Sequence, residues 1–172
     1  MAPILILSVL GIIELGMILF VTSLLEGSVR SAARFGITGY SPTGISREER
    51  VLQILEENTA GLVDMDTVVF TQTVYPSFDS IGSPEPYVDD SPANGAYDAG
   101  EEFQDINGNG QWDSDMGVDG VGGPGDVVVY TVRVDWQLLT PMLAPFIGDG
   151  GVLPLSASIV VRNEPFESGG TG

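Results

Sequence analysis

The stretch DINGNGQWD, residues 105–113, places oxygen-bearing side chains at alternate positions. It matches the first half of an EF-hand loop, with ligands at loop positions 1, 3, 5 and 9, a backbone carbonyl at position 7 and glycine at position 6. Gly110, at position 6, permits the positive-φ turn that draws the ligands together. Ca²⁺ takes six or more oxygens at about 2.4 Å. The spacing therefore predicts a calcium site made by Asp105, Asn107, Asn109, Gln111 and Asp113.

One position separates this loop from a complete EF-hand. Position 12, where a glutamate normally binds calcium through both oxygens, is Met116. The missing carboxylate must therefore come from elsewhere in the chain. The candidates are Asp115, Asp119 and Asp126.

The loop is also the second unit of an internal repeat with an offset of 15 residues. Both units follow the pattern D-x-x-x-N-G-x-aromatic-D, the first beginning at Asp90 and the second at Asp105. In the first unit Glu101 fits position 12, but Pro92 at position 3 has no side-chain ligand. This unit predicts a second, poorer calcium site with the ligands Asp90, Asn94, Asp98 and Glu101. The alternative is that the insertion, residues 89–126, is a solvated acidic loop rich in turn residues.

Glu14 is the single charged residue in the apolar run of residues 3–25. A carboxylate within such a helix costs about 3 kcal/mol on membrane insertion. One interpretation is that it is protonated or bonds a hydroxyl, such as Ser8 or Thr22, of a neighbouring copy. The other is that it pairs with a positive group of another subunit, such as a free N-terminal amine. Two flanking glycines would let another helix approach closely. The residues thus assigned to assembly are Glu14, Gly11 and Gly16.

The same run is long enough to cross a bilayer, because its 23 residues rise about 1.5 Å each against a hydrocarbon core of roughly 30 Å. A cleavable signal peptide fits less well, since no basic residue precedes the run and no small-x-small site follows it. The helix is predicted to continue until Gly36 and Gly39 end it. Past the apolar run, charged residues four apart form one ion-paired stripe that is also assigned to assembly: Glu26, Arg30 and Arg34.

These arginines bear on orientation. Arg30 and Arg34 follow the apolar run and no basic residue precedes it, so the positive-inside rule alone would place the head in the cytoplasm. Calcium at millimolar concentration is instead an extracellular condition. We expect that a basic leader before Met1 was removed or omitted, and that the head faces outside.

Composition limits what the head can bind. The chain has 24 acidic residues against 6 basic ones, a net charge of −18, and no basic residue from Val51 to Val132. Such a surface repels phosphate backbones, so nucleic acid is excluded as a partner. The chain has neither Cys nor His, which excludes zinc sites, thiol chemistry and His-based triads. Acidic pairs such as Glu101 and Glu102 lie in a turn-rich stretch without an apolar cleft, so no enzyme is expected.

The remaining chain predicts an α+β head. Ser46 and Glu49 form a capping box before a short helix that Gly61 ends. Alternating apolar residues predict strands at 67–75, 126–138 and 154–162, the last two paired antiparallel. The predicted fold is a long N-terminal hydrophobic helix followed by a small head, in which a short helix packs on an antiparallel sheet of about three to four strands. The organisation is a transmembrane or filament-core helix at 1–39 and a head at 40–172, with the acidic calcium-loop-like insertion at 89–126.

Four segments have a distinctive sequence: APILILSVLGIIELGMILFV (Ala2–Val21), SVRSAARFG (Ser28–Gly36), TPMLAPFIG (Thr140–Gly148) and LPLSASIVVRNEPF (Leu153–Phe166). They resemble the TadE/TadG-like minor pilins of tight-adherence systems, within the type IV pilin-like family. The resemblance implies a pilin-like protein that is exported and assembled through its N-terminal helix. The calcium-type insertion departs from the family pattern.

The predicted function is structural. We expect a subunit that is anchored in the inner membrane and then assembles through its N-terminal helix into an extracellular or periplasmic filament, with one or two calcium ions stabilising the head. Its partners would be copies of itself, in a helical homopolymer, or other pilins. The alternative is a membrane-anchored, calcium-dependent binding or adhesion module that does not polymerise.

Overall fold

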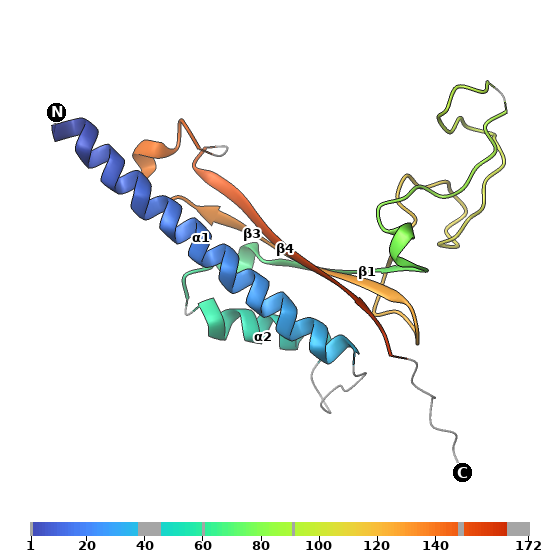
Figure 1. Cartoon of the computed structure of the whole chain (residues 1–172), viewed down its shortest axis with the longest axis horizontal. Coiled ribbons are helices and arrows are strands. Elements are labelled where there is room, and N and C mark those ends of the chain that lie inside the picture. Colours follow the sequence, from blue (N-terminus) through green and yellow to red (C-terminus); the bar gives the residue numbers. More distant parts are fainter. Residues whose placement is uncertain (1, 38–45, 60, 91, 148–149, 165–172) are drawn as a thin grey trace, which may run out of the picture.

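The computed structural model describes residues 2–37, 46–59, 61–90, 92–147 and 150–164. It confirms the α+β class: a long apolar helix, a short helix and a four-stranded antiparallel sheet (Figure 1). The helices are α1 (Ala2–Ile37) and α2 (Arg47–Thr59). The strands are β1 (Val69–Tyr75), β2 (Val118–Asp119), β3 (Val127–Gln137) and β4 (Val152–Arg162). The short 3₁₀ turns are η1 (Met65–Thr67), η2 (Phe78–Ser80) and η3 (Pro141–Leu143).

The capping box before α2 is formed as predicted. The Ser46 amide donates to Glu49 Oε2 at 2.8 Å, and the Glu49 amide donates to Ser46 Oγ at 3.1 Å. The side chain of Leu55 is completely buried against the core. Near the end of α2, Asn58 Nδ2 donates to Ser28 Oγ at 3.2 Å, and this bond ties α2 to α1.

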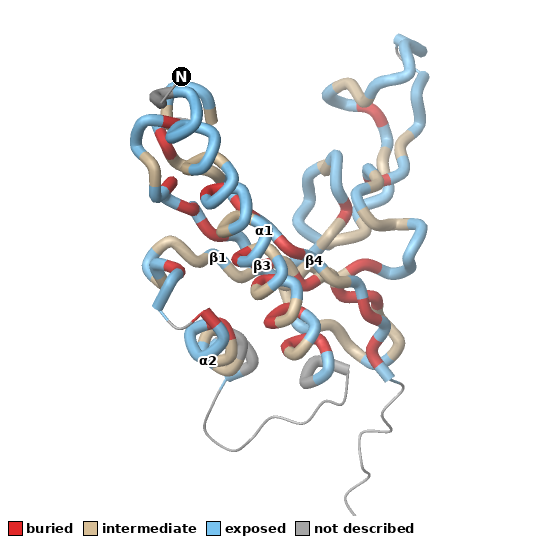
Figure 2. The backbone as a smooth tube through the Cα atoms, turned by 60° about the vertical axis from the view of Figure 1, so that its left-hand side comes forward, coloured by how far each residue is buried: buried red, intermediate tan, exposed pale blue. Residues whose placement is uncertain are grey.

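The sheet has the strand order β2-β1-β3-β4, and every neighbouring pair is antiparallel. The predicted pairing of the last two strands is confirmed, with Tyr130 opposite Ile159. Along β3 the burial alternates as the apolar pattern predicts, because α1 covers one face of the sheet, and α2 in turn packs against α1 (Figures 1 and 2). The buried residues of β3 on that face are Val128, Tyr130, Val132, Val134 and Trp136.

The second half of α1 belongs to the core of the head. Its inward-facing residues are at most 3% exposed and share one hydrophobic cluster with α2, β3 and β4: Val21, Leu25, Val29, Ala32 and Ala33. Their spacing of three and four residues is that of one helix face. The predicted division between residues 39 and 40 lies outside the described residues, as does Gly39. The helix itself ends at Ile37, one residue after Gly36.

All three predicted strands have a boundary that differs from the prediction. Strand β3 runs from Val127 to Gln137 rather than over 126–138. Strand β1 begins at Val69 rather than at residue 67, because Asp64 caps η1 by accepting the Asp66 amide at 3.1 Å. Strand β4 begins two residues before Pro154, where Val152 pairs with Gln137. The two-residue strand β2 was not predicted, since so short a segment has no alternation to detect.

Candidate functional site

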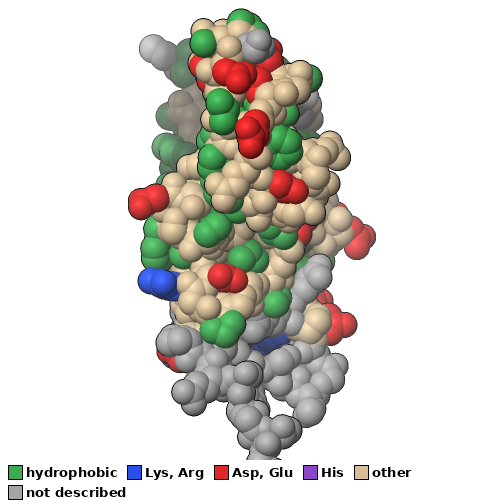
Figure 3. Space-filling model, turned by 90° about the vertical axis from the view of Figure 1, so that its right-hand side faces the viewer, with side chains coloured by type: hydrophobic (Ala, Val, Ile, Leu, Met, Phe, Trp, Pro, Cys, Tyr) green, Lys and Arg blue, Asp and Glu red, His purple; other side chains and the backbone are tan. Residues whose placement is uncertain are grey.

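The acidic insertion forms two consecutive loops, a first loop at residues 89–101 and a second loop at residues 105–113, which we call the paired loops. They are joined where Tyr87 and Phe103 form an antiparallel bridge. The Val88 amide donates to the Glu102 carbonyl, and the Gln104 amide to the Pro86 carbonyl, both at 2.8 Å. The paired loops and the N-terminal end of α1 lie at opposite ends of the molecule (Figure 1). Acidic side chains are scattered over the end that carries the loops (Figure 3).

The second loop is a tight turn organised by its own side chains. Asp105 Oδ1 accepts the Gly108 amide at 2.6 Å, and Oδ2 accepts the Gly110 amide at 2.8 Å. Asn107 and Asn109 each donate a side-chain N–H to Asp113 Oδ2 at 2.6 Å. Gly110 has the positive φ of 79° that the motif requires. Four predicted ligand side chains are therefore gathered on one turn.

The fifth predicted position, Gln111, lies on the same turn. Its amide donates to Asn109 Oδ1 at 2.7 Å, and its side chain is exposed. Its expected contribution is a backbone carbonyl, so an exposed side chain agrees with that assignment.

The first loop repeats this hydrogen-bonding pattern with one correction. Its first acidic position is Asp89, not Asp90. Asp89 accepts the Asn94 amide at 2.9 Å and the Gly95 amide at 2.8 Å. Asn94 Nδ2 donates to Asp98 Oδ2 at 2.8 Å, as Asn109 does to Asp113 in the second loop. The first loop has one more residue between aspartate and asparagine than the second, so an alignment at a constant offset selects the wrong aspartate.

Each loop is closed by a buried glutamate that follows the same rule. Glu101, 7% exposed, accepts the Asp98 amide at 2.9 Å and the Asp90 amide at 3.3 Å in the first loop. Glu85, completely buried, accepts the Ile106, Asn107 and Asp113 amides of the second loop at 2.7, 3.1 and 3.1 Å. Glu85 lies four residues before the first loop and closes the second loop. Glu101 lies four residues before the second loop and closes the first loop.

The repeat pattern D-x-x-x-N-G-x-aromatic-D begins at an aspartate, so it does not include Glu85. The pattern E-x-aromatic-x-D occurs at residues 85–89 and again at 101–105. This longer repeat points both to Glu85 and to Asp89 as the first acidic position of the first loop.

The three carboxylates proposed to complete the second loop lie elsewhere. Asp115 accepts the Tyr75 hydroxyl at 3.0 Å and the Gly117 amide at 3.0 Å, which ties the chain after the loop to β1. Burial, and then the hydrogen bond to Asp115, raise the pKa of Tyr75 above its usual value. Asp119 lies in β2, and Asp126 accepts the Gly123 amide at 2.7 Å. Met116, at position 12, packs with Tyr75 in a small second core.

The aromatic positions of the repeat supply a local core. Tyr97 and Trp112 stack with ring centroids 4.5 Å apart and planes at 13°. Tyr87 meets both rings edge-on at 5.8 Å, and Phe103 meets Tyr97 in the same way. Trp112 Nε1 donates to the Glu85 carbonyl at 2.9 Å. The paired loops are therefore packed together through these four rings, although most of their other residues are exposed to solvent.

The donor set bears on whether a metal ion fits. Among the described residues, no group of three or more Asp or Glu side chains is arranged to hold a metal ion by itself. An ion in the second loop would therefore need oxygens from Asn107, Asn109 and the backbone in addition to Asp105 and Asp113. This mixture of carboxylate, amide and carbonyl oxygens is what Ca²⁺ accepts in loops of this kind.

Glu14 has partners that the sequence did not suggest. Its side chain is 1% exposed and is held by the chain's own head. Oε1 accepts the Leu139 amide at 3.1 Å and lies 3.4 Å from Trp136 Nε1, while Oε2 accepts the Thr140 amide at 2.9 Å. Within one chain Glu14 is satisfied without a hydroxyl or an amine of another copy, and its role in assembly stays a prediction. We call this contact of Glu14 with residues 136–140 the Glu14 clasp.

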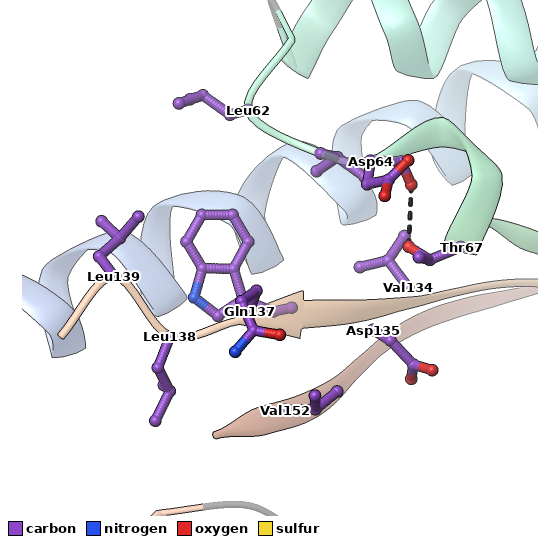
Figure 4. Close-up of a pocket in the computed structure, with 11 residues that line it drawn as sticks. Leu62, Asp64, Thr67, Val134, Asp135, Gln137, Leu138, Leu139 and Val152 are labelled. Atoms are coloured by element: carbon purple, nitrogen blue, oxygen red, sulfur yellow. Dashed lines mark hydrogen bonds between the residues drawn. The ribbon is translucent and has the colours of Figure 1, made fainter. Parts of the chain in front are cut away.

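A groove lies beside the clasp, between the connection from α2 to β1 and the end of β3 (Figure 4). Its volume is about 470 Å³, and Leu62, Val134 and Val152 are among its lining residues. Thr67 Oγ1 donates to the Asp64 carbonyl at 2.8 Å on one wall. The lining mixes aliphatic side chains with polar ones, including Asp64 and Asp135.

The other residues assigned to assembly face outward. A side chain built on Gly11 or Gly16 would meet nothing within 4 Å, so both leave room for another molecule. Glu26, Arg30 and Arg34 lie on the exposed side of α1. The first part of the helix also exposes large apolar side chains by half or more: Ile4, Leu5, Ile6, Ile12, Ile13, Leu15, Leu19 and Phe20.

The fold thus defines a small α+β head carried on one apolar helix, and by length and composition Ile4–Arg34 could cross a membrane. Residues 1–34 match the family model described as TadE-like protein. This N-terminal region is therefore TadE-like, as its resemblance indicated. Neither the curated proteins nor the solved structures gave a match to the chain.

Proposed function

We propose that this chain is a structural, non-enzymatic, pilin-like subunit. It is held in the inner membrane by α1 and then assembles through that helix, with copies of itself or with other pilins, into an extracellular or periplasmic filament. The observation that supports this proposal most strongly is the division of α1. The first half exposes apolar side chains such as Ile4 and Ile12, each 70% exposed, whereas the second half is built into the head.

The exposed half of α1 requires a partner because of its size and chemistry. Removing apolar surface from water contributes about 25 cal/mol per Å², and contiguous apolar patches of this kind mark interaction or membrane surfaces. Lipid covers such a helix before assembly, and neighbouring helices cover it in a filament. The second half of α1 shares one hydrophobic core with the head, so the head is held at a fixed position along the helix.

The test is a substitution on the exposed half with a matched control. Ile12→Asp places a charge on the helix, and Phe78→Asp places one on an apolar side chain of similar type that is 53% exposed in η2. Ile12→Asp should abolish membrane retention and filaments in electron microscopy of shed material while leaving the circular dichroism of the head unchanged. Phe78→Asp should leave membrane retention and filament formation unchanged. Normal filaments from Ile12→Asp would refute the helix-based assembly.

The second candidate function is a membrane-anchored binding module, favoured by the position of the paired loops at the end farthest from the N-terminus (Figure 1). Electron microscopy separates the two. If the unmodified chain stays in the membrane fraction and forms no ordered polymer under any condition of export, the binding module is the better description.

We also propose that the paired loops bind calcium. In the second loop the ligands are Asp105, Asn107, Asn109, Asp113 and the carbonyl of Gln111. In the first loop they are Asn94 and Asp98 with Asp89 in the place expected of Asp90. Glu101, the predicted ligand at position 12 of the first loop, also accepts backbone amides of that loop, as Glu85 does in the second. Bound calcium would neutralise the acidic side chains that each loop brings together.

Calcium should stabilise the folded head by mass action. Extracellular calcium modules have dissociation constants of about 0.1–1 mM, so calcium at about ten times the dissociation constant adds about 1.4 kcal/mol. EGTA should lower the melting temperature and expose the loops to protease, and Asp105→Ala should reproduce both effects. Asp79→Ala, which removes the same charge outside the loops, should not. Absence of calcium uptake in calorimetry at millimolar concentration would end the metal proposal.

A further inference from the structure

The loop that closes the Glu14 clasp carries an exposed apolar surface of its own. We call residues 138–147 the collar. Leu138 and Leu143 point into the core, at 4% and 7% exposed. Between and after them the side chains of Leu139, Met142 and Phe146 are 56%, 66% and 79% exposed. The collar runs beside the first half of α1, where Glu14 accepts the amides of Leu139 and Thr140 (Figure 1).

The collar is also free of charge. No charged residue occurs from Trp136 to Ile147, in a chain whose net charge is −18. The only charged residue of α1 before Glu26 is Glu14, and the clasp buries it to 1% exposure. The described residues of the collar and of α1 before Glu26 therefore carry no charge apart from the buried Glu14, and both segments expose large apolar side chains.

Most backbone amides of the collar donate within the molecule. Pro141 and Pro145 have no N–H. Of the remaining amides, that of Met142 has no acceptor among the described residues, and those with acceptors within the molecule are Leu138, Leu139, Thr140, Leu143, Ala144, Phe146 and Ile147. Lipid-exposed irregular backbone does not occur within the hydrocarbon core, so a collar in contact with lipid would lie at the boundary with the headgroups. Glu14 contributes directly, because its two oxygens accept the Leu139 and Thr140 amides.

From these observations we infer that the collar is a second membrane contact: Leu139, Met142 and Phe146 enter the surface of the same bilayer that holds α1. The inference rests on the proposed anchoring by α1. Residues 2–13 rise about 18 Å at 1.5 Å per residue. A collar at the boundary between headgroups and acyl chains therefore places Ala2 beyond the middle of a hydrocarbon core of roughly 30 Å. The collar thus sets how deep the head sits.

The occupant is lipid rather than a second copy because the collar lies beside the exposed apolar half of α1, which is proposed to sit in the bilayer. A bilayer covers a charge-free surface of irregular shape without needing a complementary partner. A second copy is the competing occupant, and the test below separates the two.

The experiment uses the full chain in phosphatidylcholine vesicles whose acyl chains carry bromine near the headgroup or near the middle. Phe146→Trp reports on the collar, and Phe78→Trp is its matched control, an exposed phenylalanine in another short turn. Leu5→Trp, at a position 66% exposed on α1, reports on the anchor. Because the chain has two tryptophans of its own, the fluorescence of the unmodified chain is subtracted from that of each variant.

The Phe146→Trp signal should be quenched at least threefold more by bromine near the headgroup than by mid-chain bromine, and the Phe78→Trp signal should not be quenched. Quenching of Leu5→Trp without quenching of Phe146→Trp would overturn the collar inference alone. If neither Leu5→Trp nor Phe146→Trp is quenched, the proposed anchoring by α1 is wrong as well. If Phe146→Trp becomes shielded only as protein concentration rises, and equally in detergent, a second copy covers the collar and the lipid inference is wrong.

Discussion

Replacing Glu14 with leucine should open the clasp locally. Glu14 accepts two backbone amides at 2.9 and 3.1 Å and faces the Trp136 indole at a weaker 3.4 Å. Leucine keeps the bulk and removes every acceptor, so the Leu139 and Thr140 amides lose their partners. An unsatisfied buried donor costs about 1–3 kcal/mol. Both amides lie at a partly buried site that water can reach after a small movement, so about 2–4 kcal/mol is expected.

The assay is hydrogen exchange of the peptide that contains Leu139 and Thr140, measured on the full chain in detergent. Each 1.4 kcal/mol is a factor of ten, so exchange should accelerate by about 30- to 1,000-fold. Glu14→Gln retains one acceptor oxygen and should give a smaller acceleration. Leu15→Gln changes the neighbouring residue, which is 57% exposed, and should leave exchange unchanged. If Glu14→Leu changes exchange by less than threefold, the carboxylate does not hold these amides.

Three further predictions concern the head. Leu25→Ala should cost about 2–5 kcal/mol of unfolding free energy in urea titrations, because Leu25 is completely buried, whereas Leu19→Ala, at a 60% exposed position, should cost little. Glu85→Gln should accelerate limited proteolysis within the second loop by about tenfold, because the Ile106, Asn107 and Asp113 amides lose a charged acceptor; the exposed control Glu102→Gln should not. The folded-state pKa of Tyr75 is raised above its ordinary value of 10.0. The stability it contributes is therefore full below pH 10 and is lost as the pH rises through the raised pKa, so Tyr75→Phe should flatten the fall of urea midpoints above pH 10.

The sequence predicted those parts of the fold that have a strong local signal. The capping box at Ser46 and the alternation along β3 depend on neighbouring residues, and both are observed. The turn at Gly110 was predicted for the same reason, since only glycine adopts its positive φ without strain. In each case the residues that decide the structure lie within a few positions of one another.

The features that the sequence did not predict depend on contacts between distant residues. Glu14 is 122 residues away from Trp136 in the chain, and no periodicity links them. Glu85 closes the second loop from 28 residues before Asp113. The choice of Asp89 over Asp90 depends on a single extra residue in the first loop, which a repeat aligned at constant spacing conceals.

The position of Glu14 in α1 is the clearest link between the fold and the proposed assembly. The apolar run extends to Leu25, but Val21 and Leu25 are completely buried in the head and are unavailable to lipid or to another subunit. Leu19 and Phe20 on the opposite side of this segment are still half or more exposed, so after the clasp the helix is buried on one face only. At this boundary the Glu14 carboxylate accepts two backbone amides of the collar. It thereby sets the point along α1 at which the head begins. Shifting Glu14 by one helical turn would therefore change how far α1 projects, even though the composition of the helix would remain the same.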